Sequence, residues 1–356
     1  MGLSKSPLLA AHGMAGATFV ESAGWLVPAS FGSVPDECAA VRTAAGVYDL
    51  SDQGVVSLVG PDTRRFCNGM FTNNIRDLAV GRGNASAMVD EKARIQGMLR
   101  LYHVDTEAFL AVLEGVTPEA FEARYAKYII FDDVEVTDLS EQLGVVSVQG
   151  PAAAATLARA GLPVPEGEGA LVSVGSDPVA SVRVATNARS VAGGYDIIAP
   201  RDALAALWAG LLGAGAKPVG LDAREVLRID AGLPRWPVDM SEKSLIHELR
   251  LVPTHASFEK GCYIGQEVIN RIDVMGQVVK KIWGLEMGED AIPPIGAEVK
   301  IGDDVVGTVL SGAREGSRVR VLALLRKAAW EQGKDVSVHA GGRIVPATVS
   351  DLPFPS

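Results

Sequence analysis

Residues 257–272, SFEKGCYIGQEVINRI, form the stretch of this chain in which the most chemically useful residue types gather. It contains a thiol (Cys262), an amine (Lys260), two glycines and a Gln-Glu pair. The apolar residues from Ile264 onward have helical spacing. We therefore expect a loop over 258–263 that leads into an amphipathic helix.

Cys262 would lie just before the start of that helix. The unpaired N–H groups and the positive end of the helix dipole favour a thiolate there, and the ammonium of Lys260 acts in the same direction. Gly261 and Gly265 allow the main chain to approach a ligand or another backbone closely. These features predict a reactive or ligand-binding cysteine at a domain junction. The spacing supports about equally the alternative that Cys262 is a small buried apolar residue.

The composition predicts a globular protein of two or three domains, because the chain has 356 residues and 48% of them are hydrophobic. Cys38, Cys67 and Cys262 are far apart and odd in number, which argues against a disulfide framework and favours a reducing compartment. No segment has the length of apolar sequence needed to cross a bilayer, and the first residues lack a signal-peptide core, so a cytoplasmic location is expected. The net charge of -10 disfavours nonspecific binding to nucleic acid.

An internal repeat organises the first two thirds of the chain. The sequence VVSLVGP at 55–61 recurs as VVSVQGP at 145–151. Each copy is a β-branched run that ends in Gly-Pro and precedes a helical pattern, two or more strands and a closing helix. A chance match is the alternative, but the shared order of elements favours a duplication, so we expect two related α+β units. The expected helices are 62–70, 118–128, 152–160 and 201–212, and the expected strands are 85–89, 98–104, 109–113, 180–185 and 195–198.

The two ends of the chain have different patterns. Residues 1–50 predict an irregular arm followed by a helix that begins near Pro35. Residues 221–230 predict another helix. From 278 onward, short β-rich runs separated by Gly, Asp and Pro predict a small antiparallel barrel. The predicted domains are residues 1–144, 145–277 and 278–356.

The string KGCYIGQE at 260–267, followed by Arg271, resembles the signature of the YgfZ-type folate-binding proteins. These are relatives of the glycine-cleavage T-protein, an aminomethyltransferase, and are implicated in iron–sulfur cluster maintenance. Residues 42–54, 72–75 and 227–240 look like further landmarks of the superfamily, in the family's order. The resemblance implies a duplicated ferredoxin-like, T-protein-like folate-binding body of the α+β class with a C-terminal β-barrel. It also implies a tetrahydrofolate or related folate cofactor.

The same resemblance implies that two carboxylates are missing. The catalytic aspartate of the T-proteins maps onto Gly97, with Met98 beside it, and the glutamate that grips the pterin maps near Ala192. A glycine can neither donate nor accept a proton through a side chain. We therefore do not expect an active aminomethyltransferase.

The binding residues are better preserved in the resemblance. Arg224 matches an arginine that faces the carboxylate tail of folate in T-proteins, and a guanidinium suits a carboxylate. Without the resemblance, Arg224 would be a surface helix residue paired with Asp222 or Glu225. Aromatic and turn residues could contact the pterin, although core and turn roles explain them equally well. The cofactor-binding candidates are Arg224, Arg228, Tyr195, Asn74, Asp90 and Gln266.

In the absence of the transferase carboxylates, Cys262 is expected to supply the reactive atom, with Lys260 assisting it. It would act as a nucleophile, a redox thiol or a transient ligand to iron on an iron–sulfur client or carrier protein, because one cysteine cannot hold a [4Fe–4S] cluster alone. We expect no metal site within the chain. One alternative is a folate-dependent one-carbon transferase that uses Asp90, Glu91 or Asp133. The other is a noncatalytic module whose KGCYIGQE loop docks partners.

Overall fold

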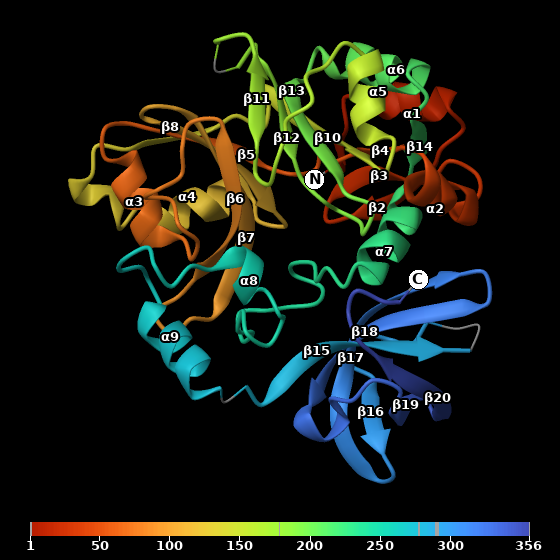
Figure 1. Ribbon diagram of the computed structural model, residues 1–356. Coiled ribbons are helices and arrows are strands. Elements are labelled where there is room, and N and C mark those ends of the chain that lie inside the picture. Colours follow the sequence, from red (N-terminus) through yellow and green to blue (C-terminus); the bar gives the residue numbers. More distant parts are fainter. Residues whose placement is uncertain (1, 178, 277, 289–291, 356) are drawn as a thin grey trace. The chain divides into compact units, whose positions relative to one another are not determined.

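The structure is a computed structural model that describes residues 2–177, 179–276, 278–288 and 292–355 (Figure 1). It divides into two compact units, each of which is discontinuous in the chain. Unit 1 comprises Met1–Cys67, Ile75–Ala85 and Leu99–Arg224, and unit 2 comprises Asn68–Asn74, Ser86–Met98 and Glu225–Ser356. The predicted domain boundary at residue 277 falls outside the described residues.

The first copy of the repeat forms a five-stranded sheet with the order β6-β7-β8-β5-β9. Thr117 begins α4 as its cap, because its hydroxyl accepts a hydrogen bond from the Ala120 N–H and Pro118 occupies the first turn. The strands are β5 (Val55–Val59), β6 (Arg82–Val89), β7 (Ile95–Asp105), β8 (Ala108–Glu114) and β9 (Glu135–Asp138), and the helices are α3 (Thr63–Met70), α4 (Pro118–Tyr125) and the 3-10 helix η1 (Ile129–Phe131).

The second copy forms a six-stranded sheet with the order β11-β12-β13-β10-β4-β14. The strands are β4 (Gly46–Asp49), β10 (Leu143–Gln149), β11 (Leu171–Val174), β12 (Val182–Thr186), β13 (Gly194–Pro200) and β14 (Lys217–Val219), and the helices are α5 (Ala153–Arg159), α6 (Leu204–Gly213) and α7 (Leu221–Asp230). Every residue of β10 is buried, because β10 pairs with β13 on one side and β4 on the other. The repeated strand and the helix after it are present in both sheets, as β5–α3 and β10–α5, which confirms the predicted α+β class.

The N-terminal arm is ordered, so the prediction of an irregular arm was wrong. It forms a three-stranded sheet with the order β1-β3-β2, and a helix that Ser33 caps by accepting from the Asp36 N–H. The strands over 4–5 and 18–22 are mostly exposed, so they lack the alternation of apolar and polar residues by which a strand is detected. The strand over 25–30 is partly buried. The elements are β1 (Ser4–Lys5), α1 (Leu9–Met14), β2 (Thr18–Ser22), β3 (Trp25–Ser30) and α2 (Val34–Thr43).

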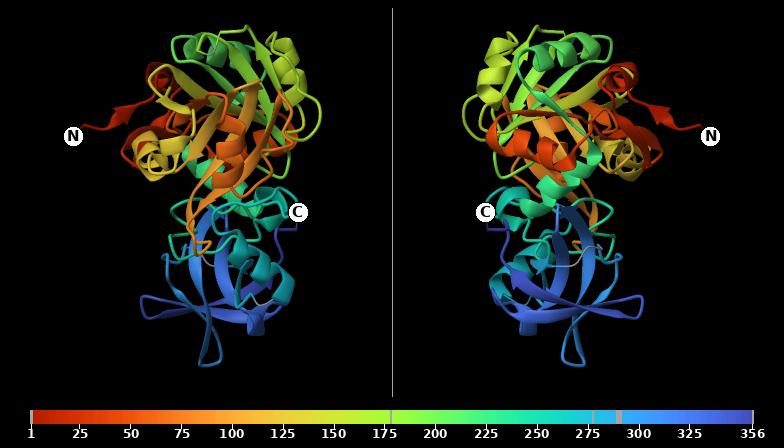
Figure 2. Two further views of the ribbon diagram at one scale, coloured as in Figure 1. Left: turned by 90° about the vertical axis from the view of Figure 1, so that its left-hand side faces the viewer. Right: turned by 90° about the vertical axis from the view of Figure 1, so that its right-hand side faces the viewer.

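The C-terminal part of unit 2 is a closed barrel with the order β15-β18-β17-β16-β19-β20, which confirms the predicted barrel (Figure 2). The strands are β15 (Lys280–Met287), β16 (Glu298–Ile301), β17 (Asp304–Glu315), β18 (Arg318–Arg326), β19 (Asp335–Ala340) and β20 (Arg343–Ser350), with the 3-10 helix η2 (Lys327–Ala329). Alternate residues along these strands point inward and fill the barrel with valine, leucine and alanine side chains. Unit 2 also contains α8 (Val252–His255) and α9 (Gln266–Met275).

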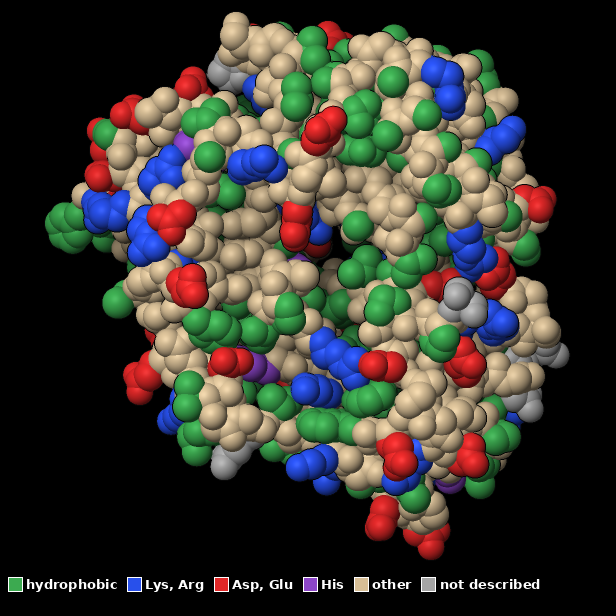
Figure 3. Space-filling model, viewed as in Figure 1, with side chains coloured by type: hydrophobic (Ala, Val, Ile, Leu, Met, Phe, Trp, Pro, Cys, Tyr) green, Lys and Arg blue, Asp and Glu red, His purple; other side chains and the backbone are tan. Residues whose placement is uncertain are grey.

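The surface carries charges of both signs. On the face drawn in Figure 3, basic and acidic side chains are interspersed with apolar ones. Among the described residues, no helix combines the length and apolar character that crossing a membrane requires.

Candidate functional site

The Cys262 loop, residues 257–265 in unit 2, joins α8 to α9. Helix α9 begins at Gln266, two residues later than expected, so Cys262 lies four residues before the helix. Its side chain is exposed, whereas Cys38 and Cys67 are buried. The alternative that Cys262 is a buried apolar residue is therefore wrong.

Lys260 anchors this loop from inside. Its side chain is 1% exposed, its ammonium donates to the Phe71 carbonyl, and its Nζ lies 4.4 Å from the centroid of the Tyr263 ring. Its own carbonyl accepts from Asn68 Nδ2 at 3.0 Å. The ammonium is therefore held by the Phe71 carbonyl and the Tyr263 ring. The expectation that it stabilises a Cys262 thiolate stays a prediction.

Gly265 shows why the loop needs a glycine at this point. Its φ is +78°, and a Cβ there would lie 2.6 Å from the Asp90 carbonyl oxygen. Gly265 therefore makes the close backbone approach predicted from the sequence. Gly261 has a φ of +92°, but a Cβ there would meet no atom within 4 Å, so only its backbone conformation favours glycine.

Three cofactor candidates lie in unit 2 beside this loop or on the hairpin that it contacts. Asp90 closes the turn between β6 and β7, because its Oδ1 accepts from the N–H groups of Lys92 and Arg94 at 2.9 and 2.8 Å. The Asn74 N–H donates to Asn73 Oδ1 at 2.8 Å, and Gln266 is the first residue of α9. The turn role of Asp90 is therefore observed, and the folate contacts of Asn74, Asp90 and Gln266 stay predictions.

Arg228 is enclosed by partners within unit 2. It is 8% exposed, and its guanidinium donates to Asp239 Oδ2 at 2.6 Å, to Glu225 Oε2 at 2.7 Å and to Ser311 Oγ at 2.8 Å. Burial lowers the pKa of Arg228, but the two carboxylates outweigh that effect, so its pKa lies above the ordinary value. These bonds occupy the guanidinium of Arg228, and its predicted contact with the cofactor stays a prediction.

Arg224 belongs to unit 1 and is only partly enclosed. Its Nη1 donates to the Asp49 carbonyl at 3.0 Å, and its Cζ lies 5.9 Å from the centroid of the Tyr48 ring. Neither Asp222 nor Glu225 pairs with it among the contacts that the structure describes. Arg224 is thus held at the turn between β4 and β5 with guanidinium N–H groups to spare, which suits the predicted contact with a carboxylate.

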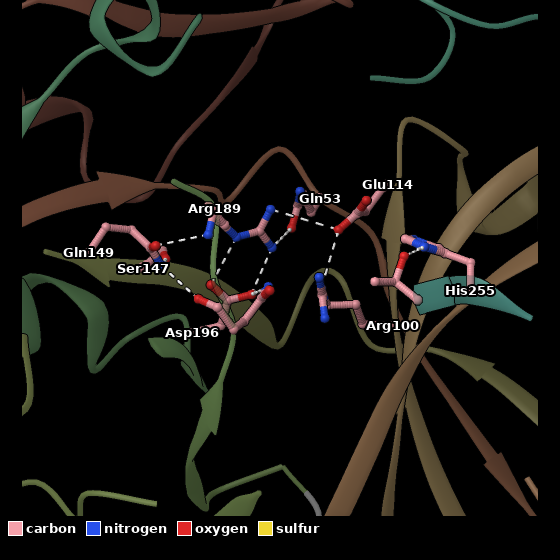
Figure 4. A network of polar contacts seen from close by, with 10 residues as sticks. Gln53, Arg100, Glu114, Ser147, Gln149, Arg189, Asp196 and His255 are labelled. Atoms are coloured by element: carbon pink, nitrogen blue, oxygen red, sulfur yellow. Dashed lines mark hydrogen bonds and ion pairs between the residues drawn. The ribbon is translucent and has the colours of Figure 1, made fainter. Parts of the chain in front are cut away.

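A second cluster in unit 1, which we call the Arg189 network, is drawn in Figure 4. Arg189 pairs with Asp196 through two hydrogen bonds, Nε to Oδ1 at 2.9 Å and Nη2 to Oδ2 at 2.7 Å. Its Nη2 also donates to Gln53 Oε1 at 3.3 Å. Glu114 lies between two arginines, with its Oε1 3.7 Å from Arg189 Nη1 and 3.7 Å from Arg100 Nε. Gln149 Oε1 accepts from the Arg189 backbone N–H at 2.8 Å. The members are Gln53, Arg100, Glu114, Gln149, Arg189 and Asp196.

The Arg189–Asp196 pair stays charged in spite of its burial. Burial raises the pKa of Asp196, but the Arg189 guanidinium and the Asn187 amide more than offset this, so its pKa is lowered. Burial lowers the pKa of Arg189, and the Asp196 and Glu114 carboxylates reverse the effect, so its pKa is raised. The pair therefore places a fixed, balanced charge inside unit 1.

Sequence reasoning missed this network, although a signal for it was present. Arg100 interrupts the apolar strand sequence MLRLYHV, and a charged residue within a buried strand needs a partner. Arg189 lies three residues before Ala192, in the segment that the sequence analysis considered for the missing pterin-binding glutamate. Tyr195, a predicted stacking residue, alternates with Asp196 along β13 and packs on the apolar core of the second sheet.

The positions assigned to the T-protein aspartate carry no carboxylate. Gly97 lies in β7 with a φ of +155°, a backbone angle that favours glycine, and Met98 follows it. Successive strand residues point to opposite faces of a sheet, so position 97 lies on one face of β7 and position 98 on the other. Neither of them supplies an acidic side chain to its face.

Comparison with known proteins identifies the family. The model of the GCVT N-terminal domain matches residues 8–254. The chain belongs to the GCVT family. An aminomethyltransferase from Stenotrophomonas maltophilia (strain K279a) is 31% identical over 350 residues, which cover 96% of this chain and 94% of the relative. An aminomethyltransferase from Geobacillus kaustophilus (strain HTA426) is 28% identical over 367 residues, covering 99% and 98%.

The fold of this GCVT-family protein also matches a solved structure. The crystal structure of the glycine cleavage system aminomethyltransferase T from Bartonella henselae superposes with a TM-score of 0.90 at 25% identity. The match covers 99% of this chain and 98% of that chain, so it includes the barrel. The described residues of this family member contain no group of three or more His, Cys, Asp or Glu side chains that could hold a metal ion.

Proposed function

We propose that this GCVT-family protein binds a tetrahydrofolate-type cofactor and uses Cys262 as a functional thiol in iron–sulfur cluster assembly or repair. Membership of the family and the partly open guanidinium of Arg224 support the binding of a folate. A carboxylate of the folate tail would accept hydrogen bonds from the Arg224 nitrogens that Asp49 leaves unused.

The observation that carries the proposal is the exposed sulfur of Cys262 on an anchored loop. The loop is fixed on both sides of the cysteine, by the buried Lys260 and by the Ile264 N–H, which donates to the Gly69 carbonyl at 3.0 Å. A thiolate held in this way can form a bond to an iron of a cluster on a partner protein. A [4Fe–4S] cluster is ordinarily held by four cysteine ligands, so the partner would supply the others.

Complementation tests the role of the thiol. Cells that lack this protein would be supplied with the wild type, Cys262→Ser or Glu259→Gln, and the activity of a [4Fe–4S] enzyme would be measured. Glu259→Gln is the matched control, because it changes an exposed neighbour on the same loop. We expect the control to restore the activity and Cys262→Ser to fail. Full restoration by Cys262→Ser would remove the thiol from the proposal.

Calorimetry with tetrahydrofolate tests the cofactor separately. We expect Arg224→Ala to weaken binding by about 10- to 100-fold, because a hydrogen bond from a charged group contributes about 1.5–3 kcal/mol. Arg228→Lys serves as a comparison, since Arg228 is already engaged inside unit 2. Unchanged affinity in Arg224→Ala would contradict the proposed tail contact.

A folate-dependent one-carbon transferase is the second candidate, and the names of the relatives favour it. The aminomethyltransferase of S. maltophilia matches almost the whole chain. Of the carboxylates considered for this role, Asp90 is used in a turn, while Glu91 and Asp133 are exposed. Turnover of an aminomethyl donor with tetrahydrofolate by the wild-type protein would favour this candidate over the maintenance role.

A further inference from the structure

Arg100 is the least satisfied member of the Arg189 network. Its only described ion pair is with Glu114, and the 3.7 Å between Arg100 Nε and Glu114 Oε1 is too long for a hydrogen bond. Arg100 Nε is buried and has no hydrogen-bond partner among the described residues. The side chain as a whole is 25% exposed. In Figure 4 a single dashed line joins Arg100 to the rest of the network.

Tyr102 supplies a second unused donor. It follows Arg100 by two residues on β7, so both side chains leave the same face of the strand. Tyr102 is 2% exposed, and its hydroxyl has no hydrogen-bond partner among the described residues. Its ring lies against Gly83 of β6. The contact is so close that a Cβ added at Gly83 would lie 2.3 Å from Cδ1 of the Tyr102 ring.

The Tyr102 hydroxyl lies amid the charges of the network. Burial raises the pKa of Tyr102, and the charges of Asp196, Arg100, Arg189 and Glu114 all act on the phenol. The hydroxyl therefore stays protonated at neutral pH and remains a hydrogen-bond donor. A buried donor without an acceptor is unfavourable, and here a guanidinium and a phenol both lack one.

We propose that Arg100 and Tyr102 form a binding site for the carboxylate of a small molecule, with the guanidinium and the phenol hydroxyl as its two donors. A carboxylate would complete the hydrogen bonds of both groups, and the guanidinium fork matches its geometry. The inference goes beyond the proposed folate binding and does not rest on it.

The charge of the network favours a monoanion. Two arginines face two carboxylates, Glu114 and Asp196, so the network is neutral before a ligand binds. Glu114, between the arginines, would repel a second negative charge on the ligand. A monocarboxylate is therefore favoured over a dianion such as hydrogen phosphate.

Equilibrium binding of benzoate to the full chain tests the site, with benzamide as the neutral ligand of the same shape. We expect benzoate to bind at least tenfold more tightly than benzamide, and inorganic phosphate not to compete. Arg100→Gln should weaken benzoate binding by tenfold or more, and Tyr102→Phe, which removes only the hydroxyl, by about three- to tenfold. Arg94→Gln changes an exposed arginine of the same hairpin and should leave the affinity unchanged.

The carboxylate could belong to a separate substrate or to the folate tail, and competition distinguishes the two sources. Benzoate that is displaced by 4-aminobenzoyl-glutamate, the tail fragment of folate, would indicate the tail. Simultaneous binding of both would indicate a separate carboxylate ligand. Equal or absent binding of benzoate and benzamide would overturn the proposal. Wild-type affinity for benzoate in folded Tyr102→Phe and Arg100→Lys proteins would also overturn it.

Discussion

Asp49 shows how single buried residues set the stability of unit 1. Its carboxylate is 3% exposed and accepts from His12 Nε2 at 2.8 Å, from the Ser51 N–H at 2.9 Å and from the Ser6 hydroxyl. Burial raises the pKa of Asp49, but these hydrogen bonds outweigh that effect, so its pKa lies below the ordinary value of 3.8. Asp49 thereby ties the N-terminal arm to β4.

This arrangement predicts a loss of stability in acid. Because the folded pKa is lowered, the stabilisation by Asp49 is complete above the unfolded value of 3.8 and disappears as the pH falls through the folded value. Asp49→Asn should cost about 1–3 kcal/mol of unfolding free energy at pH 7, because it removes a charged acceptor from the buried hydrogen bonds of Ser6, His12 and Ser51. Urea unfolding at a series of pH values checks this. A difference between wild type and variant that did not shrink below pH 3.8 would contradict the assignment to the ionised carboxylate.

At the scale of secondary-structure elements, the Cys262 loop is held in place by its contact with the β6–β7 hairpin. The turn between β6 and β7 presents the Asp90 carbonyl to Gly265, and the two backbones approach too closely for any side chain. This contact fixes the end of the loop at the point where α9 begins. The position of the Cys262 sulfur relative to the rest of unit 2 therefore depends on a glycine three residues away.

Gly265→Ala should destabilise the protein more than Gly276→Ala. Both glycines have a positive φ, +78° and +61°, at which an alanine costs about 1–2 kcal/mol. Only Gly265 adds a clash, with the Asp90 carbonyl, whereas nothing lies within 4 Å of the added carbon at Gly276. Urea unfolding should show the difference, and hydrogen exchange at Ile264 should accelerate only in Gly265→Ala. Equal effects of the two variants would contradict the close contact.

Elements with strong periodicity could be predicted from the sequence, and the contacts between distant residues could not. Helix α7 was predicted with its observed bounds, and the barrel was predicted from its short strands, because apolar spacing and Gly or Asp turns are local signals. The Cys262 loop was found in the same way. The Arg189 network joins Gln53, Glu114 and Arg189 from separate parts of the chain, and the partner of a buried arginine cannot be identified from spacing. The exposed strands β1 and β2 of the N-terminal arm were missed because they lack an apolar face.

At the scale of the whole molecule, two of the hydrophobic clusters among the described residues share no residue. One fills the barrel and includes Leu285 and Val321, and the other lies along the six-stranded sheet and includes Leu157 and Trp208. Each core belongs to one compact unit. Because the two clusters share no residue and lie in different units, we expect them to unfold in separate steps.

Two matched core variants test this expectation. Leu285→Ala in the barrel and Leu157→Ala in unit 1 each remove a fully buried leucine and should each cost about 2–5 kcal/mol. Hydrogen exchange in moderate urea, measured by mass spectrometry, should then show faster exchange over residues 280–350 in the first variant and over β10 and β13 in the second. If each variant instead accelerated exchange in both regions alike, the two cores would unfold together, and the chain would behave as one cooperative body. Separate steps would mean that the barrel can open while the Arg189 network and Arg224, both in unit 1, keep their geometry.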